Sequence, residues 1–292
     1  MTPELKARLA SVFGNAIRAA VPVPGGDINS AFRVTLADQR QLFVKSHAGP
    51  PPGFYSAEAE GLRWLAEANV LTVPKVLSVA DDEPAYLALR FIDSAARCAD
   101  FDVRLGRGLA ALHQSLGRSE SAFGLDRANY IGVLPQDNTP MPDWPSFYAQ
   151  RRLLPQLQLA VQSGLVDHRM RREFDRLLSS IEQLAGPTEP PARLHGDLWR
   201  GNLMVDQAGL PCLIDPAVYA GHREMDLAMM QLFGGFSAAV FDAYDQVWPR
   251  TAGHQRRVAL YQLYPLLVHV NLFGAGYLAA VERALTQALS RD

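Results

Sequence analysis

Cysteine, lysine and long apolar runs are all scarce in this 292-residue sequence. Its two cysteines, Cys98 and Cys212, stand far apart and form neither a CxxC pair nor a metal-ligand cluster, which indicates reduced thiols. The most apolar stretch, residues 261–281, is interrupted by polar residues and a proline, so no run of about 18 apolar residues can span a membrane. The first residues lack the apolar segment of a signal peptide. We therefore expect a cytoplasmic protein without a membrane partner.

Neither sign of charge dominates. The 28 basic and 30 acidic residues give a net charge of −2, and no block is strongly basic, so nucleic acid is not expected as a partner. Hydrophobic residues make up 48% and charged residues 20%, a globular balance that excludes disorder and coiled coil. At about 150 residues per domain, the length suggests two lobes.

Hydrophobic periodicity changes near residue 92. Before it, the pattern predicts helices at residues 2–18 and 54–69 and strands at 31–36, 41–45, 73–79 and 85–92. After it, helices dominate, at residues 100–115, 144–163, 168–185, 225–233, 237–247 and 255–292, with short strands at 203–205 and 212–214. The sequence thus predicts an α+β protein, with a small, mostly β lobe of residues 1–92 and a larger, mostly α-helical lobe of residues 93–292.

The strongest chemical signal is residues 195–202, His-Gly-Asp-Leu-Trp-Arg-Gly-Asn. Asp197 and Asn202 have the D-x-x-x-x-N spacing of a kinase catalytic loop, and a strand-turn-strand then leads to Asp215. Phosphoryl transfer needs a carboxylate beside the attacking hydroxyl and oxygen ligands for the Mg²⁺ that bridges the ATP phosphates. A solvated turn would explain one such aspartate, but the two motifs joined by a hairpin favour chemistry.

Lys45 ends the Leu-Phe-Val-Lys strand and is one of only three lysines, against 25 arginines. A kinase places a lysine there to reach the α- and β-phosphates and to pair with a glutamate on the next helix. Glu58 and Glu60 are both on that helix and point to different sides of it. We prefer Glu58 as the partner.

Two backbone segments complete the predicted nucleotide site. Gly25 and Gly26 form a turn before the Lys45 strand, where glycines let backbone N–H groups approach phosphate oxygens. Leu89, Arg90 and Phe91 end the first lobe, where backbone groups can bond to a nucleotide base. A plain linker is the alternative for this second segment.

These motifs resemble the fructosamine kinase (ketosamine 3-kinase) family, within the protein-kinase-like fold shared with aminoglycoside phosphotransferases. The resemblance covers nearly the whole chain and is most specific at residues 214–229, IDPAVYAGHREMDLAM. It implies that Asp197 is the catalytic base, that Asn202 and Asp215 hold Mg²⁺, and that Lys45 with Glu58 positions the ATP phosphates. The implied reaction is ATP-dependent phosphorylation of the 3-hydroxyl of a ketoamine, a sugar rearranged on an amine.

Several residues are candidates for contact with the acceptor. Trp199 and His269 can form a sugar-facing wall, although core packing is the alternative for both. Arg200 departs from the family, in which a small residue usually follows the tryptophan, and its side chain either points to solvent or reaches an anionic group of the acceptor. Residues that closely follow Asp215 are expected to face the acceptor as well: Tyr219, His222 and Glu224.

Three histidine and aspartate residues are expected to be structural. His195 is expected to hydrogen-bond the catalytic-loop backbone, His113 to lie in the core, and Asp226 to cap its helix or brace the catalytic loop.

Other functions remain open from the sequence alone. One is a kinase for another small alcohol, such as an aminoglycoside or choline. Another is a non-catalytic nucleotide-binding module, which the intact Lys45, Asp197, Asn202 and Asp215 argue against. Protein kinase activity is less favoured, because Asp-Pro-Ala replaces Asp-Phe-Gly at Asp215 and the short stretch before Glu224 leaves no room for an activation segment.

Overall fold

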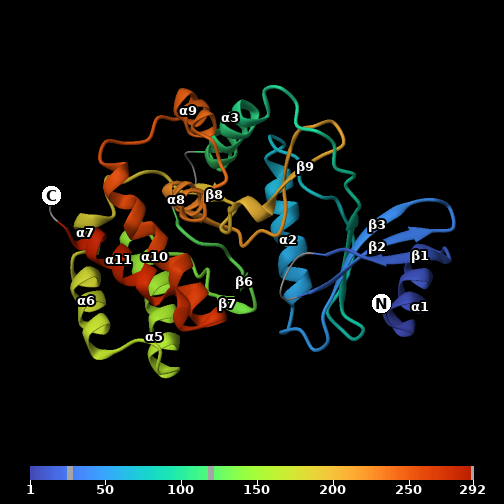
Figure 1. Ribbon diagram of the computed structural model, residues 1–292, viewed down its shortest axis with the longest axis horizontal. Helices are drawn as coiled ribbons and strands as arrows, with labels where there is room; N and C mark the ends of the chain where they lie inside the picture. Colours follow the sequence, from blue (N-terminus) through green and yellow to red (C-terminus); the bar gives the residue numbers. More distant parts are fainter. Residues whose placement is uncertain (25–28, 118–121, 291–292) are drawn as a thin grey trace. The chain divides into compact units, whose positions relative to one another are not determined.

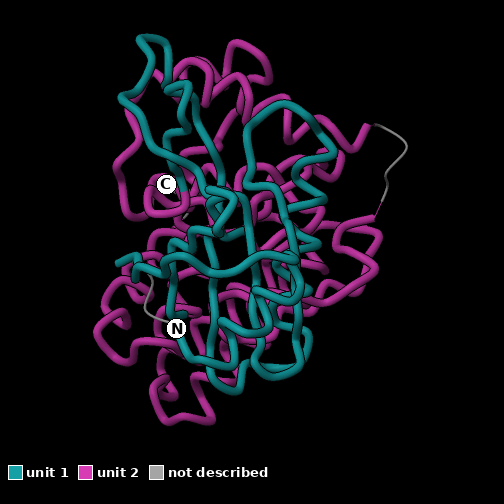
Figure 2. The backbone as a smooth tube through the Cα atoms, turned by 90° about the vertical axis from the view of Figure 1, so that its right-hand side faces the viewer, with its two compact units in different colours: residues 1–101, 203–216 teal, residues 102–202, 217–292 magenta. Residues whose placement is uncertain are grey.

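The computed structural model describes residues 1–24, 29–117 and 122–290. The chain forms two compact units, residues 1–101 with 203–216 and residues 102–202 with 217–292, which Figure 2 distinguishes by colour. This division differs from the predicted boundary after residue 92 in two respects. The first unit extends to residue 101, and it also includes the segment 203–216, which falls in the second lobe of the predicted division.

The first unit is built on an antiparallel sheet of five strands in the order β1-β2-β3-β5-β4. The predicted helix over residues 2–18 is wrong at its C-terminal end. Helix α1 (Pro3–Phe13) stops at Gly14, which adopts a left-handed conformation with φ 59°, and the chain continues as an edge strand. The strands are β1 (Ile17–Pro22), β2 (Ser30–Leu36), β3 (Gln41–Ser46), β4 (Val76–Ala80) and β5 (Tyr86–Arg90).

Helices cover both faces of this sheet (Figure 1). Leu5 and Leu9 of α1 pack on the face that carries Val44 and other alternate residues of β2 and β3. Because successive residues of a strand point to opposite faces, Lys45 faces the other side, where α2 (Phe54–Glu67) packs against β4 and β5. Strand alternation therefore turns the Lys45 side chain toward α2.

A hairpin from the later part of the chain also belongs to the first unit. It consists of β9 (Leu203–Val205) and β10 (Pro211–Leu213). The Leu213 N–H donates to the Thr72 carbonyl (2.9 Å), and the Cys98 N–H donates to the Gly209 carbonyl (3.0 Å). These bonds fix the hairpin to the unit and so position Asp215, which follows β10.

The second unit is mainly α-helical and surrounds α10 (His254–Phe273), whose residues are buried on most sides. Two short antiparallel pairs accompany the helices, β6 (Asn129–Ile131) with β7 (Leu134–Gln136) and β8 (Ala192–Leu194) with β11 (Tyr219–Gly221). The other helices are α3 (Phe101–Gln114), α4 (Trp144–Phe147), α5 (Leu154–Gln162), α6 (His168–Ser179), α7 (Ile181–Leu184), α8 (Glu224–Leu232), α9 (Ala238–Val247) and α11 (Leu278–Leu289). Three short segments are a π-helix, η1 (Tyr148–Leu153), and the 3₁₀ turns η2 (Arg200–Asn202) and η3 (Ala275–Tyr277).

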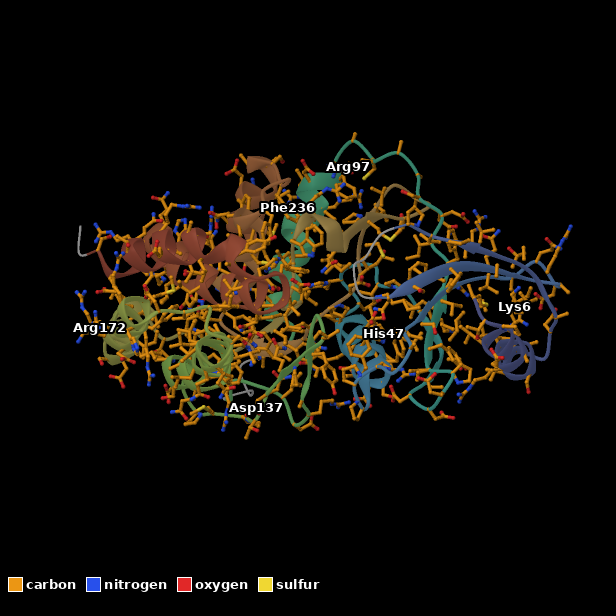
Figure 3. All side chains as sticks on the ribbon, turned by 60° about the horizontal axis from the view of Figure 1, so that its bottom comes forward. Lys6, His47, Arg97, Asp137, Arg172 and Phe236 are labelled. Carbon is orange, nitrogen blue, oxygen red and sulfur yellow. The ribbon has the colours of Figure 1, made fainter. Side chains whose placement is uncertain are left out.

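Three long predicted helices are interrupted. The helix expected over residues 168–185 is divided at Ser180 into α6 and α7. The helix expected from residue 255 to the C-terminus breaks at Gly274 (φ 88°), and the helix expected over residues 144–163 contains the π-helical turn. Charged side chains lie on the outer faces of the helices, as Lys6 of α1 and Arg172 of α6 illustrate (Figure 3). Across residues 1–24, 29–117 and 122–290, no helix has both the length and the hydropathy for a membrane span.

Candidate active site

The first unit brings three of the predicted residues together. The Nζ atom of Lys45 lies 2.7 Å from Oε1 of Glu58 and 2.6 Å from Oδ1 of Asp215. Burial alone would lower the pKa of Lys45, but the negative charges of Asp215 and Glu58 outweigh it and raise that pKa well above its usual range. The ammonium is therefore charged at neutral pH, and its helix partner is Glu58, as preferred from the sequence.

Asp215 combines an unusual backbone with an accessible carboxylate. It is one of few non-glycine residues with a positive φ (54°), a conformation that costs energy and often occurs at functional sites. Its side chain is 43% exposed although one of its oxygens contacts Lys45. A carboxylate held in this way has the hard oxygen donors that Mg²⁺ prefers.

The second unit holds the catalytic-loop motif. The amide nitrogen of Asn202 donates to Oδ2 of Asp197 (3.0 Å) and to the Asp197 carbonyl (2.8 Å). Because the nitrogen faces Asp197, the amide oxygen faces away from it, and that oxygen is the atom able to bind a cation. This amide oxygen, like the Asp215 carboxylate of the first unit, is a hard oxygen donor of the kind that Mg²⁺ prefers.

A buried carboxylate braces this loop. Asp226 accepts hydrogen bonds from the backbone N–H groups of His195 (2.7 Å) and Gly196 (2.9 Å), and His113 Nε2 lies 3.2 Å from it. Burial would raise the pKa of Asp226, but the His113 hydrogen bond, the nearby histidines and the Gly196 N–H together lower it. The predicted bracing role of Asp226 and the core position of His113 are thus confirmed.

The turn at Gly196, whose N–H donates to the Asp226 carboxylate, requires a glycine. Gly196 has φ 84°, and a Cβ atom there would overlap the carbonyl oxygen of Ala217. The Ala217 N–H in turn donates to the His195 carbonyl (2.9 Å). The segment after Asp215 and the catalytic loop are therefore packed directly on each other.

A buried amide network fixes the same segment, and sequence reasoning missed it. Gln136 Nε2 donates to the Ala217 carbonyl (3.1 Å), and Asn129 Nδ2 donates to the Val218 carbonyl (2.8 Å). The Tyr264 hydroxyl donates to Oε1 of Gln136 (2.6 Å). The sequence signal that could have revealed this network is the pair of amides Asn129 and Gln136 within the short stretch NYIGVLPQDN, which forms a largely apolar hairpin.

A small hollow of about 20 Å³, close to the size of one water molecule, opens beside Asp197. His269 of α10 also lines it, together with Tyr264 and Met229. His269 Nδ1 lies 2.7 Å from the Pro265 carbonyl, so this nitrogen must carry the proton that it donates. Burial lowers the pKa of His269, which favours the neutral ring.

Trp199 and Arg200 lie at the surface of the loop. The Trp199 side chain is 41% exposed and its ring covers Gly201, where any Cβ atom would overlap it. The aliphatic part of Arg200 packs against Gly235, whose φ is 86°. Three of the residues predicted to contact the acceptor are therefore suitably placed. Trp199 and Arg200 are accessible at the surface, and His269 lines the hollow beside Asp197.

Tyr219, His222 and Glu224, which the sequence predicts to face the acceptor, are buried. The Tyr219 ring lies 3.9 Å from the Arg152 guanidinium, and His222 stacks on Tyr261 with ring centroids 5.3 Å apart. Glu224 pairs with Arg257 at 2.6 Å. Burial lowers the pKa of His222. Tyr219 is buried in β11, which pairs with β8, and His222 and Glu224 are buried where the chain passes from β11 into α8. This geometry gives no support for their contact with a substrate.

The predicted base-binding segment uses two of its own donors. The Arg90 N–H donates to the Lys75 carbonyl (2.8 Å) and the Phe91 N–H to the Gln41 carbonyl (3.3 Å), while Leu89 is buried in the sheet. A base would have to use other backbone groups here. Gly25 and Gly26 fall outside the described residues.

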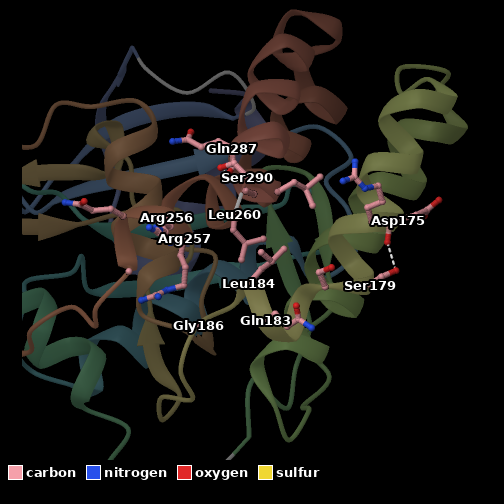
Figure 4. A pocket seen from close by; sticks show the side chains of 16 residues that line it. Asp175, Ser179, Gln183, Leu184, Gly186, Arg256, Arg257, Leu260, Gln287 and Ser290 are labelled. Atoms are coloured by element: carbon pink, nitrogen blue, oxygen red, sulfur yellow. Dashed lines mark hydrogen bonds between the residues drawn. The ribbon is translucent and has the colours of Figure 1, made fainter. Parts of the chain in front are cut away.

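A much larger hollow of the second unit, about 1050 Å³, lies between α6, α7, α10 and α11 (Figure 4). Arg256 and Gln287 are among its lining residues, and it shares no residue with the hollow beside Asp197. Size alone therefore does not locate the chemistry in this unit.

Solved structures place the fold among the protein-kinase-like phosphotransferases. An aminoglycoside phosphotransferase in ternary complex with ADP and hygromycin B matches with a TM-score of 0.65 at 16% identity, over 98% of this chain and 99% of the other, which concerns fold alone. A crystal structure described as a "putative fructosamine-3-kinase" from Thermobifida fusca matches with a TM-score of 0.89 at 39% identity, over 99% of both chains.

Sequence comparison identifies the family. The fructosamine kinase family model matches residues 1–291. A "Probable ketoamine kinase" of Enterococcus faecium is 37% identical over 91% of this chain and 93% of that protein. Another, of Lactiplantibacillus plantarum, is 39% identical over 93% and 94%. The chain therefore belongs to the fructosamine kinase family, as its motifs predicted.

Proposed function

We propose that this protein transfers the terminal phosphoryl group of ATP to the 3-hydroxyl of a small ketoamine. Family membership supports a small-molecule kinase, and the names of the relatives point to ketoamines. The observation that carries the proposal is the Lys45–Glu58–Asp215 cluster of the first unit, found in one chain with the Asp197–Asn202 loop of the second. Together they supply the groups that phosphoryl transfer requires.

In this mechanism Asp197 accepts the proton of the attacking hydroxyl. The hydroxyl oxygen forms a bond to the terminal phosphorus while the bond from that phosphorus to the leaving ADP oxygen breaks. Asn202 holds the Asp197 carboxylate through its amide nitrogen, so the carboxylate keeps one orientation. Positioning and neutralisation of charge contribute most of the rate.

The phosphates need cationic partners. Lys45, kept charged by its two carboxylates, would contact the α- and β-phosphates, and Glu58 would hold it in place. Asn202 and Asp215 would bind Mg²⁺, which neutralises the charge that develops on the phosphate oxygens. The donor set consists of oxygens alone, which suits magnesium better than a softer metal.

We also assign the protein to the cytoplasm. Both cysteines are free thiols, and burial raises the pKa of Cys212 to about 12, which makes that thiol unreactive. Neither nucleic acid nor a membrane is part of the proposed function.

One assay of ADP release tests the proposal. Purified protein with Mg²⁺ and ATP would be given fructosamines, aminoglycosides and choline, and Asp197→Asn would serve as the inactive control. We expect turnover with the fructosamines and product phosphorylated at the 3-hydroxyl by NMR. Turnover only with an aminoglycoside or choline would show another small-alcohol kinase, and ATP binding without any turnover would show a binding module.

A further inference from the structure

An aromatic cluster surrounds His269 in the second unit. The centroid of the His269 ring lies 4.9 Å from that of Phe233, 5.4 Å from that of Phe273 and 5.0 Å from that of Tyr277. These four rings come from the end of α8, the last turns of α10 and η3. We call them the aromatic cluster.

Two rings of the cluster are exposed to an unusual degree. Phe233 is 41% exposed and Phe273 is 50% exposed, and both are among the large hydrophobic side chains that the described surface leaves open. Trp199, also 41% exposed, extends the apolar surface, with its ring centroid 6.4 Å from that of Phe233. Grouped exposed aromatic side chains commonly mark a binding surface, whereas single ones need no explanation.

The cluster is continuous with the hollow beside the catalytic aspartate. His269 lines that hollow together with Asp197, and the same ring contacts the three other members of the cluster. Since Nδ1 of His269 donates to Pro265, the neutral ring presents Nε2 on its other edge as a hydrogen-bond acceptor. A ligand bound at Asp197 therefore meets first a polar acceptor and then aromatic surface.

We infer that the aromatic cluster binds the amine substituent of the ketoamine, and that the preferred substituent is aromatic or otherwise apolar. This inference rests on the proposed function. With the 3-hydroxyl at Asp197, the nitrogen on carbon 1 of the same sugar is only a few bonds away, so the substituent leaves the sugar close to His269. Aromatic rings gain from edge and offset contacts with another ring, and they attract the protonated amine that joins it to the sugar.

Two fructosamines with the same sugar test the inference, one made from benzylamine and one from ethanolamine. We expect kcat/KM to be about tenfold higher for the benzyl compound, the size of a good aromatic contact. Phe273→Ala should remove most of that preference, and Phe273→Leu should retain part of it because an apolar side chain remains. Val247→Ala is the matched control, since Val247 is 40% exposed on α9 of the same unit and outside the cluster.

The possible results separate the inference from the proposed function. Equal kcat/KM for the two fructosamines in the unaltered protein would overturn the inference and leave the ketoamine kinase activity standing. An equal loss for both in Phe273→Ala would also overturn it, because a merely structural ring affects all acceptors alike. If no fructosamine is phosphorylated, the proposed function fails. In that case calorimetry tests the aromatic cluster as a binding site. The inference requires the benzyl compound to bind more tightly to the unaltered protein than to Phe273→Ala.

Discussion

The two units hold their chemical groups by different physical means. In the first, Lys45 is fixed by charge, since two carboxylates contact its ammonium at 2.6 and 2.7 Å. In the second, Asp197 is fixed by hydrogen bonds, because Asp226 holds two backbone N–H groups of its loop and Asn202 holds its carboxylate. A charged ligand can compete for the first arrangement but not for the second.

The difference matches what each group has to do. Lys45 would exchange its contact with Asp215 for phosphate oxygens when ATP binds, so an ion pair that a phosphate can replace is suitable. In the proposed reaction Asp197 would meet a hydroxyl in one orientation, so its loop would benefit from the buried Asp226 brace. Substitutions in each unit should therefore have separable effects on ATP binding, turnover and stability.

Asp197→Asn should give the largest effect on rate. The side chain keeps its shape but can no longer accept the proton, so kcat should fall by about 10²–10⁴-fold while ATP affinity and melting temperature change little. Steady-state kinetics with calorimetric ATP titration would measure this. A variant that retained a tenth of the original kcat would show that Asp197 is not the base.

Asp226→Asn should break the brace. The amide nitrogen of the introduced asparagine would face the N–H groups of His195 and Gly196, where a carboxylate oxygen now accepts from them. We therefore expect a loss of about 3 kcal/mol in unfolding free energy and a lower kcat. Because the pKa of Asp226 is lowered in the fold, its contribution is present above the unfolded value near 3.9 and is lost as pH falls through the folded value. The stability deficit should therefore be full at pH 7 and shrink in acid. A deficit that is independent of pH down to pH 2 would contradict this assignment.

Much of the site follows from local sequence, and its supporting shell does not. Motif spacing predicts Lys45, Asp197 and Asn202 as site residues, with Glu58 preferred over Glu60, because each motif lies on one short segment. Gln136 could not be assigned in this way, since its partners Ala217 and Tyr264 are distant in the chain and are brought to it only by tertiary packing.

Closeness in sequence also misleads at some positions. Tyr219 and His222 follow Asp215 within a few residues, yet Tyr219 is buried in the β11–β8 pair and His222 is buried against Tyr261. The edge strand β1 begins at Ile17, inside the predicted helix, because residues 14–18 continue an apparent helical pattern that the left-handed Gly14 ends. In both cases a tertiary or backbone effect overrides the local pattern.

Lys45→Met should weaken ATP binding and also reduce stability, because it leaves the largely buried Glu58 without its cation. We expect a loss of about 2–3 kcal/mol in unfolding free energy without nucleotide. The matched variant Lys45→Met/Glu58→Gln should recover most of this stability but none of the ATP affinity. If the double variant is as unstable as the single one, the unpaired charge of Glu58 does not explain the loss of stability, and the ion pair is not what holds Lys45 in place.

Arg200→Gly should have the smallest effect and concerns selectivity. Arg200 is part of the catalytic loop between Asp197 and Asn202, and its aliphatic portion packs against Gly235. A guanidinium binds a carboxylate through two hydrogen bonds, and a partly exposed pair of this kind contributes about 1 kcal/mol, or several-fold in KM. The variant should raise KM for ketoamines of amino acids more than for ketoamines of simple amines, with kcat little changed.

A second variant separates the two effects of this substitution. Because Gly235 leaves room for the Arg200 side chain, Arg200→Gly removes packing as well as charge, whereas Arg200→Gln keeps the aliphatic stem and removes only the charge. If Arg200→Gln behaves like the unaltered protein on both substrate types, the guanidinium has no part in acceptor selectivity.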